Sequence, residues 1–333
     1  MVGVDWTSNR SKGAGQLMIA TLSIALAAGL ASALMFASIT SGEAISLLLI
    51  NLAPLPLMVV GLVWGPLGAA VGGTVATVVI ASLSGFSYCG VFAVANALPA
   101  WWLAHLVLLA RPREDSGAAG RDDELEWYPV GRILLWIVVF ATIITATMLL
   151  MMGSDAASIH NTLRKGWDDL FESSGLALND STLDTLVVIA PIGAEMAVVA
   201  VLALNLWLAA KIATTSRRLH RPWPDLKTVT LPRLTVAALV AAAALCFSGG
   251  LLSILAQVVA AGLSVAYAMA GFAVLHTLTL TMKGRVLWLG CAYAVVAGFA
   301  WALIAVALLG IADALFGLRQ RYLRARPPPL PKT

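Results

Sequence analysis

The sequence predicts an all-α protein: a polytopic bundle of transmembrane helices with eight or nine membrane segments, some of them kinked by proline. Composition is the first reason. Of the 333 residues, 60% are hydrophobic and only 11% are charged, and the mean hydropathy is +0.90, whereas roughly a quarter of the residues of a soluble domain are charged. The second reason is that the apolar residues form runs of about 20, which suit a hydrocarbon layer about 30 Å thick.

Nine apolar runs follow one another along the chain. The first follows Arg10 and Lys12 and is too long for a signal-peptide core, so we expect it to remain as a membrane anchor. The seventh is short, and Ser248-Gly249-Gly250 predicts a tight turn into the eighth. The runs are 17–40, 44–64, 66–83, 90–110, 130–152, 183–210, 234–248, 251–281 and 286–315.

These runs divide the chain into five parts. We expect a cytoplasmic N-terminal segment at 1–16, a membrane unit of four runs at 17–110 and a cytoplasmic loop at 111–129. A second membrane unit then covers 130–316, with an outer loop at 153–182 and a cytoplasmic loop at 211–232. A basic, proline-rich tail at 317–333 ends the chain.

Charge predicts the orientation, because basic residues concentrate in short cytoplasmic loops. Two loops are basic, and the segment 153–184 between them is acidic, which places it outside. Within that segment Ile159, Leu163, Trp167 and Leu170 recur at helical spacing, which predicts an amphipathic helix on the outer surface. The basic residues of the two loops are Arg111, Arg113, Arg121 and Arg132, then Lys211, Arg217, Arg218, Arg221, Lys227 and Arg233.

The basic tail conflicts with nine crossings. A cytoplasmic N-terminus and nine crossings would leave Arg319, Arg321, Arg324 and Arg326 outside. Either one run is re-entrant, with the proline-broken run 44–64 as the first candidate, or the orientation rule fails here. We favour eight crossings and a cytoplasmic C-terminus in a multi-pass protein of the cell (inner) membrane. The final Pro327–Pro331 stretch then forms a stiff extended stub.

Small residues at every fourth position predict close helix packing, because helices in lipid associate through backbone approach. Such stripes are expected to hold a compact bundle together; the alternative is that the first helix docks onto a separate membrane protein. The stripes are Ala25, Gly29, Ala33 and Ala37; Gly68, Gly72 and Ala76; and Gly290, Ala294, Gly298 and Ala302.

Two apolar runs carry an asparagine three residues before a proline. Asn51 precedes Pro54 in the second run, and Asn96 precedes Pro99 in the fourth. Proline removes a backbone donor, and lipid cannot solvate the carbonyl group that it frees. Transporters place pairs of interrupted helices around a substrate site, so these residues are candidates for such a site. Chance occurrence of two tetrapeptides is the alternative.

Glu195 is the clear ionisable residue within an apolar run. Pro191 lies four residues before it, and Asn205 follows almost three turns later. An acid in a span is costly and normally faces the bundle interior. It either lines a substrate or ion pathway or is solvated near the outer end of its span. The candidate substrate-binding set is therefore Asn51, Pro54, Asn96, Pro99, Glu195 and Asn205.

No pattern of catalytic, nucleotide-binding or metal-binding residues appears. The three cysteines lie in or beside apolar runs without metal-ligand spacing, and no GxSxG, HExxH or P-loop is present. Asp313 and Arg319, six residues apart, are expected to form a local ion pair or an interface anchor. We therefore predict no enzyme activity, no cofactor, no metal and no nucleic-acid partner; the expected partner is the lipid bilayer.

Several stretches together resemble the YybS-like family of predicted bacterial membrane proteins, in particular its proteobacterial branch. They are LAPLPLMVVGLVWGP (52–66), LPAWW (98–102), EWYPVGR (126–132), LNLWLAAK (204–211), SRRLHRPWPDL (216–226), AGFAVLH (270–276) and GIADALFGLRQR (310–321). In its N-terminal portion that family is similar to the substrate-binding S-components of energy-coupling-factor transporters, which dock onto a coupling protein. The sequence Ala27-Ala28-Gly29-Leu30-Ala31 fits their docking pattern. This chain has more helices than an S-component and a long outer loop, and the resemblance implies no site residue.

Two functional hypotheses remain. In the first, the protein is a small-molecule transporter or a substrate-capture subunit that works with other membrane proteins such as a coupling subunit. In the second, it is a non-catalytic membrane scaffold or envelope assembly factor that uses its small-residue stripes and basic loops to hold other proteins.

Overall fold

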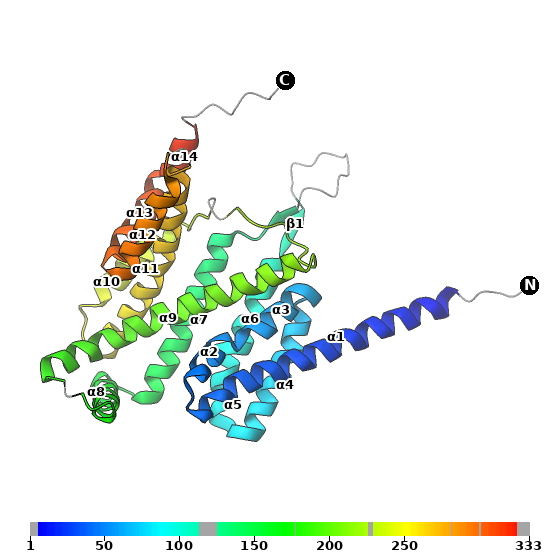
Figure 1. Cartoon of the computed structure of the whole chain (residues 1–333), viewed down its shortest axis with the longest axis horizontal. Coiled ribbons are helices and arrows are strands. Elements are labelled where there is room, and N and C mark those ends of the chain that lie inside the picture. Colours follow the sequence, from blue (N-terminus) through cyan, green and yellow to red (C-terminus); the bar gives the residue numbers. More distant parts are fainter. Residues whose placement is uncertain are drawn as a thin grey trace, which may run out of the picture. The chain divides into compact units, whose positions relative to one another are not determined.

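The computed structural model describes residues 6–112, 125–176, 178–225, 229–280, 282–299 and 301–324, with side chains from residue 18 onward. This part of the chain is almost entirely helical, which confirms an all-α architecture (Figure 1). It divides into two compact units: Met1–Tyr128 with Ala200–Trp223, and Pro129–Val199 with Pro224–Thr333. Residues 1–5 of the predicted N-terminal segment, 113–124 of the predicted loop 111–129, Lys227, and the tail beyond Arg324 lie outside the described residues.

The first unit is a series of apolar helices joined by very short turns. Gly65 and Gly85, with φ of 98° and 91°, make the turns on either side of α4, a backbone conformation that suits glycine. The elements are α1 (Trp6–Ala37), a 3-10 turn η1 (Ser38–Ser41), α2 (Ala44–Leu52), α3 (Pro54–Trp64), α4 (Pro66–Ser84), α5 (Phe86–Phe92), η2 (Ala93–Ala97), α6 (Leu98–Leu108), strands β1 (Ala110–Pro112) and β2 (Leu125–Trp127), and the end of α9 (Asp180–Thr215).

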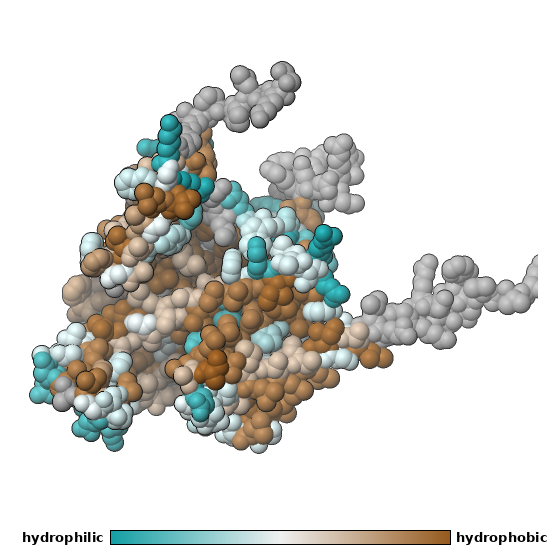
Figure 2. Space-filling view, viewed as in Figure 1, coloured by the Kyte–Doolittle hydropathy of each residue, from teal (hydrophilic) through white to brown (hydrophobic). Residues whose placement is uncertain are grey.

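The stripe of small residues on α1 packs against the stripe on α4. Ala25 and Ala33 are buried, and a Cβ atom on Gly29 would lie 2.4 Å from the carbonyl oxygen of Gly72. The two backbones are therefore in direct contact, which confirms intramolecular packing for these two stripes. The opposite side of α1 exposes Leu22, Leu26, Leu30 and Leu34, and the surface of this helix in Figure 2 is largely hydrophobic.

The two asparagine–proline stretches differ in local structure. Between α2 and α3 the chain breaks at Ala53, but 44–64 still forms one candidate span of 21 residues. Asn96 lies in η2, a π-helical turn inside the continuous candidate span Phe86–Leu108. A π turn accommodates one extra residue without ending the helix. The two similar Asn–Pro stretches therefore do not form a structural repeat.

The second unit is built around the long helix α11. Figure 1 shows α10 to α13 side by side, in yellow to red. Glycines permit the contact between α11 and α13, because a Cβ atom on Gly271 or Gly310 would lie 2.0 Å from a carbonyl oxygen of the other helix. The elements are α7 (Val130–Met152), α8 (Ala156–Ser173), the start of α9, α10 (Leu234–Leu245), α11 (Gly250–Leu278), α12 (Arg285–Gly298), α13 (Ala302–Phe316) and α14 (Leu318–Arg324).

The predicted ninth run, 286–315, is not one helix. It is divided into α12 and α13, of 14 and 15 residues, each about 21 to 23 Å long at 1.5 Å per residue. In the described residues, seven helices are long and apolar enough to cross a membrane, or eight if the bent pair α13–α14 counts as one span. The seven correspond to the first six predicted runs and the eighth. The seventh forms only the 12-residue α10.

Two separate sets of contacts define the two ends of the second unit. At one end, Ile159 of the acidic segment packs with Leu149 of α7 and Val258 in the first third of α11. At the other end, Arg319 donates to the carbonyl oxygen of Val229 at 2.6 Å, and Tyr322 donates to that of Leu278, the last residue of α11, at 3.0 Å. Helix α14 therefore lies at the end of the unit that also holds the stretch before α10, opposite the acidic helix α8.

The segment from α12 to α14 forms a hairpin. Arg285, the first residue of α12, hydrogen-bonds to the carbonyl oxygen of His276 near the end of α11, and Tyr293 stacks on Phe272. Because α14 returns to Leu278, this segment starts and finishes at the same end of the unit. The chain therefore reverses its direction within 285–324, whereas the run 44–64, the first candidate for a reversal from the sequence, forms one candidate span of 21 residues.

A buried ion pair holds the corner between α13 and α14. Arg319 donates to Asp313 through Nε at 2.9 Å and through Nη2 at 2.6 Å, and its backbone N–H donates to the other carboxylate oxygen at 2.9 Å. Gly317, with φ of 64°, supplies the left-handed turn between the two helices. The predicted local ion pair is thus confirmed, and its carboxylate is fully satisfied.

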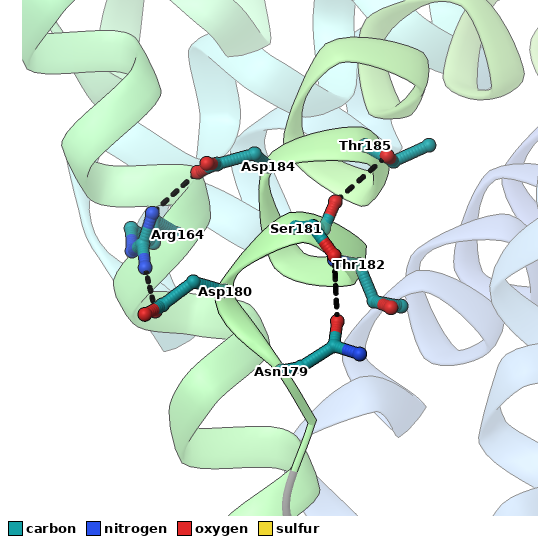
Figure 3. A network of polar contacts seen from close by, with 7 residues as sticks. All are labelled: Arg164, Asn179, Asp180, Ser181, Thr182, Asp184 and Thr185. Carbon is teal, nitrogen blue, oxygen red and sulfur yellow. Dashed lines mark hydrogen bonds and ion pairs between the residues drawn. The ribbon is translucent and has the colours of Figure 1, made fainter.

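The acidic segment contains the predicted amphipathic helix, α8. Its start carries a capping box, in which the Asp155 side chain accepts from the Ser158 backbone N–H. Ile159 is buried, but Leu170, expected on the same apolar face, is 52% exposed, so that face is shorter than predicted. Figure 3 shows Arg164 of α8 lying between Asp180 and Asp184 of α9, which fixes the start of α9 to α8.

The arrangement of the second unit predicts the sidedness of three exposed positions. In a background without cysteine, Arg233→Cys and Arg324→Cys should react with a membrane-impermeant maleimide from the same side, and Glu172→Cys from the opposite side. Labelling of intact cells and of inverted vesicles, each variant in parallel, makes the comparison. Labelling of Arg324→Cys together with Glu172→Cys would contradict the hairpin.

Candidate functional site

Glu195 lies in the interior of the second unit, among three helices. Its side chain on α9 is completely buried, and Thr142 of α7 donates to its Oε1 at 3.0 Å. On α11 a Cβ atom at Gly262 would lie 2.4 Å from the same oxygen, and 2.9 Å from Val138 of α7. The carboxyl group therefore occupies space that exists only because α11 carries glycine at this position.

The second carboxyl oxygen of Glu195 is unsatisfied. Oε2 has no hydrogen-bond partner, and neither has the hydroxyl of Thr145, which lies beside the same carboxyl group but outside hydrogen-bond geometry. Thr145 is one turn after Thr142 on α7, and it is also buried. Two unpartnered polar atoms are thus adjacent in an apolar interior, where each costs about 1–3 kcal/mol.

Among the described residues, no basic side chain forms an ion pair with this carboxyl group. The ion pairs in the described residues join Arg111 to Glu126, Arg164 to Asp180 and Asp184, and Arg319 to Asp313. Burial of an unpaired ionised carboxylate costs several kcal/mol, so the group at this place needs a proton or a bound cation. In the same part of the chain, no cluster of three or more His, Cys, Asp or Glu side chains could hold a metal ion.

Asn205 and Asn51 meet in the first unit. The buried amide of Asn205 donates to the carbonyl oxygens of Asn51 and Val201, both at 2.8 Å. Ser32 of α1 donates to the carbonyl oxygen of Ala53 at 2.6 Å. Side chains of the protein therefore satisfy two carbonyl groups at the break between α2 and α3. The Oδ1 atom of Asn205 has no hydrogen-bond partner.

The other candidate residues have separate surroundings. The exposed side chain of Asn51 donates back to Leu47 of its own helix at 2.6 Å. Pro54 is buried at the first position of α3, Pro99 is buried at the second position of α6, and Asn96 is buried in the π turn. Five of the six candidates thus belong to the first unit, and Glu195 belongs to the second with partners of its own.

Sequence analysis missed the partners of Glu195. Thr142 and Thr145 are spaced by three residues in the most apolar run, and Gly262 is one of several glycines in its helix. A spacing of three residues on a helix places two hydroxyl groups on one face. This spacing could have indicated a polar face on the helix 130–152. Nothing in one sequence shows that this face of α7 meets Glu195.

Basic side chains near the end of α9 and in the segment after it lie on tryptophan rings in the first unit. Arg218 lies 5.2 Å from the centre of the Trp64 ring, and Lys211 lies 5.3 Å from that of Trp223. Arg221 is buried against Trp127 and donates to the carbonyl oxygen of Val107 at 3.3 Å, and this burial lowers the pKa of its guanidinium group. Cations on aromatic faces suit an interfacial anchor rather than a substrate site.

Comparison with protein-family models, with curated proteins and with solved structures finds no match to this chain. The resemblance to the YybS-like family therefore stays a prediction.

The role of Asn205 predicts a stability effect. Asn205→Leu keeps the branching of the side chain, although it is larger, and removes the donor to the broken helix, so the free energy of unfolding should fall by about 1–3 kcal/mol. Asn161→Leu, at an exposed position on α8, is the control and should change it by less than about 0.5 kcal/mol. Unfolding in detergent micelles measures both. Equal stability of the two variants would show that the amide does not support the break.

Proposed function

We propose that this integral membrane protein is a small-molecule transporter or a substrate-capture subunit, and that the polar site at Glu195 takes part in its transport cycle. The observation that carries the proposal is the buried carboxyl group itself. It has one unsatisfied oxygen and no basic partner among the described residues. A costly acid inside membrane helices is normally retained for function.

A comparison within the second unit supports this reading. Asp313 is buried as well, but both of its carboxylate oxygens accept hydrogen bonds from Arg319. That is the pattern of a structural acid, in which every lone pair facing the interior has a donor. Glu195 departs from this pattern because only Oε1 is engaged. A group that is only partly satisfied at rest is free to change partners during a transport cycle.

Residues of the first unit give less support to the transport proposal than Glu195 does. Asn51, Pro54, Asn96 and Pro99 have structural explanations, whereas Asn205 keeps one buried oxygen without a donor. The resemblance to S-components supports a partner role for α1, whose Leu30 side remains exposed. In this proposal the protein resides in the inner membrane, with both termini and the basic loops in the cytoplasm and a coupling subunit beside it.

Uptake measurements test the transport proposal. In a deletion strain, wild-type protein and Glu172→Gln, an exposed control on α8, should restore the profile of metabolites taken up from the medium. Glu195→Gln should resemble the deletion, because glutamine keeps the size of the side chain but can neither ionise nor bind a cation as a carboxylate does. If deletion leaves uptake unchanged, the proposal fails. Purification in mild detergent shows whether a coupling subunit accompanies the protein.

One observation favours the second candidate, a membrane scaffold. Helix α12 has no buried residue, and there is open space beside Gly290 and Gly298 of its small-residue stripe. Gly298→Leu is therefore a fair test of docking, whereas Gly29→Leu would disrupt the contact between α1 and α4. Loss of function in Gly298→Leu with full function in Glu195→Gln and in Gly90→Leu, another open position, would favour the scaffold.

A further inference from the structure

The geometry around Glu195 points to a more specific role, which rests on the proposed transport function: we propose that Glu195 binds and releases one proton, and that Thr142 and Thr145 stabilise both states of the carboxyl group. The three side chains come from two helices of the same unit, α7 and α9. Gly262 of α11 closes the site without filling it.

The hydrogen bonds balance in the protonated state. Thr142 donates to Oε1 at 3.0 Å. A proton on Oε2 would make this group an O–H donor, and the adjacent Thr145 hydroxyl offers an acceptor. Both unpartnered atoms, Oε2 of Glu195 and Oγ1 of Thr145, would then be satisfied by one hydrogen bond. The two groups lie beside each other, so this hydrogen bond would form within the site.

The hydrogen bonds also balance after the proton leaves. The O–H bond of the acid breaks, its electron pair stays on the carboxylate, and the proton passes to water when the site opens. The Thr145 hydroxyl can rotate and donate to Oε2, since a hydroxyl is both donor and acceptor. The carboxylate then has a donor on each oxygen, from Thr145 and Thr142. Thr145 therefore reverses its role with the state of Glu195.

A proton fits this site better than a metal cation. The two carboxyl oxygens and the two threonine hydroxyls offer four oxygen atoms from side chains, whereas Ca²⁺ takes six to eight oxygen ligands and Mg²⁺ takes six. The wall contributed by α11 is Gly262, which adds no side-chain ligand. Backbone carbonyl groups in a regular helix are already engaged in helix hydrogen bonds.

No other titratable group of the three helices shares the site. On α7, Arg132 lies ten residues before Thr142; on α11, Tyr267 and His276 lie five and fourteen residues beyond Gly262. The hydroxyl of Tyr267 is engaged with Thr235 at 2.6 Å, and His276 is engaged with Tyr293 at 2.9 Å. On α9 itself, Asp184 and Lys211 are eleven and sixteen residues away from Glu195. The charge at the site therefore depends on Glu195 alone.

Infrared spectroscopy of the full-length protein in lipid vesicles tests the proton site without knowledge of the substrate and without reagent access. The C=O stretch of a protonated buried carboxyl group should be present in wild type and in Glu172→Gln, absent in Glu195→Gln, and lost as the pH is raised. Thr145→Val removes both the acceptor for the protonated acid and the donor to the ionised carboxylate. The second loss is larger because hydrogen bonds to a charged group are stronger, so the band should persist to a higher pH than in wild type. Thr147→Val, whose hydroxyl bonds only to the backbone of Ile143, is the matched control and should titrate as wild type.

Three results would overturn the proton site. They are a spectrum with no protonated carboxyl assignable to Glu195 at any pH at which the protein is folded, a band that never changes with pH, and identical titrations of Thr145→Val and Thr147→Val. These results are independent of uptake. If Glu195 titrates but deletion of the gene leaves uptake unchanged, the proton site stands and the transport function fails. If the protein transports but the Glu195 carboxyl group does not titrate, only the proton site fails.

Discussion

The structure depends on one constraint: hydrocarbon cannot hydrogen-bond to polar groups, so a membrane helix must satisfy them within the protein. The break between α2 and α3 shows how this is met. Proline interrupts the helix there, and the side chains of Asn205 and Ser32 supply donors to nearby carbonyl groups. The corner between α13 and α14 meets the same constraint with a guanidinium group and a carboxylate. Glu195 stands out because the constraint is only half met there.

Small residues, above all glycine, allow the helices of each unit to pack with their backbones in contact. Where α1 meets α4, and where α11 meets α13, backbones touch because no Cβ atom intervenes at Gly29, Gly72, Gly271 or Gly310. Such contacts gain dispersion energy and replace the hydrophobic driving force that is missing in lipid. Gly262 uses the same property differently, because the space it leaves holds a carboxyl group rather than another backbone.

The sequence predicted those features that depend on local composition. Six of the nine runs, together with the long eighth, became helices of spanning length, since about 20 apolar residues in lipid have few alternatives to a helix. The pairing of Asp313 with Arg319 also followed from their short separation. Features that depend on tertiary contacts were missed. Nothing in the run 286–315 marks a reversal as clearly as a proline would, and the partners of Glu195 lie fifty or more residues from it in the chain.

The hairpin of α12 and α13 has a consequence for the whole topology. Because it returns to the end of the second unit from which it started, α14 lies at the same end of the unit as the last residues of α11. An insertion or a loss of such a segment, which covers 285–324, would therefore leave the flanking parts of the chain at the same end of the unit.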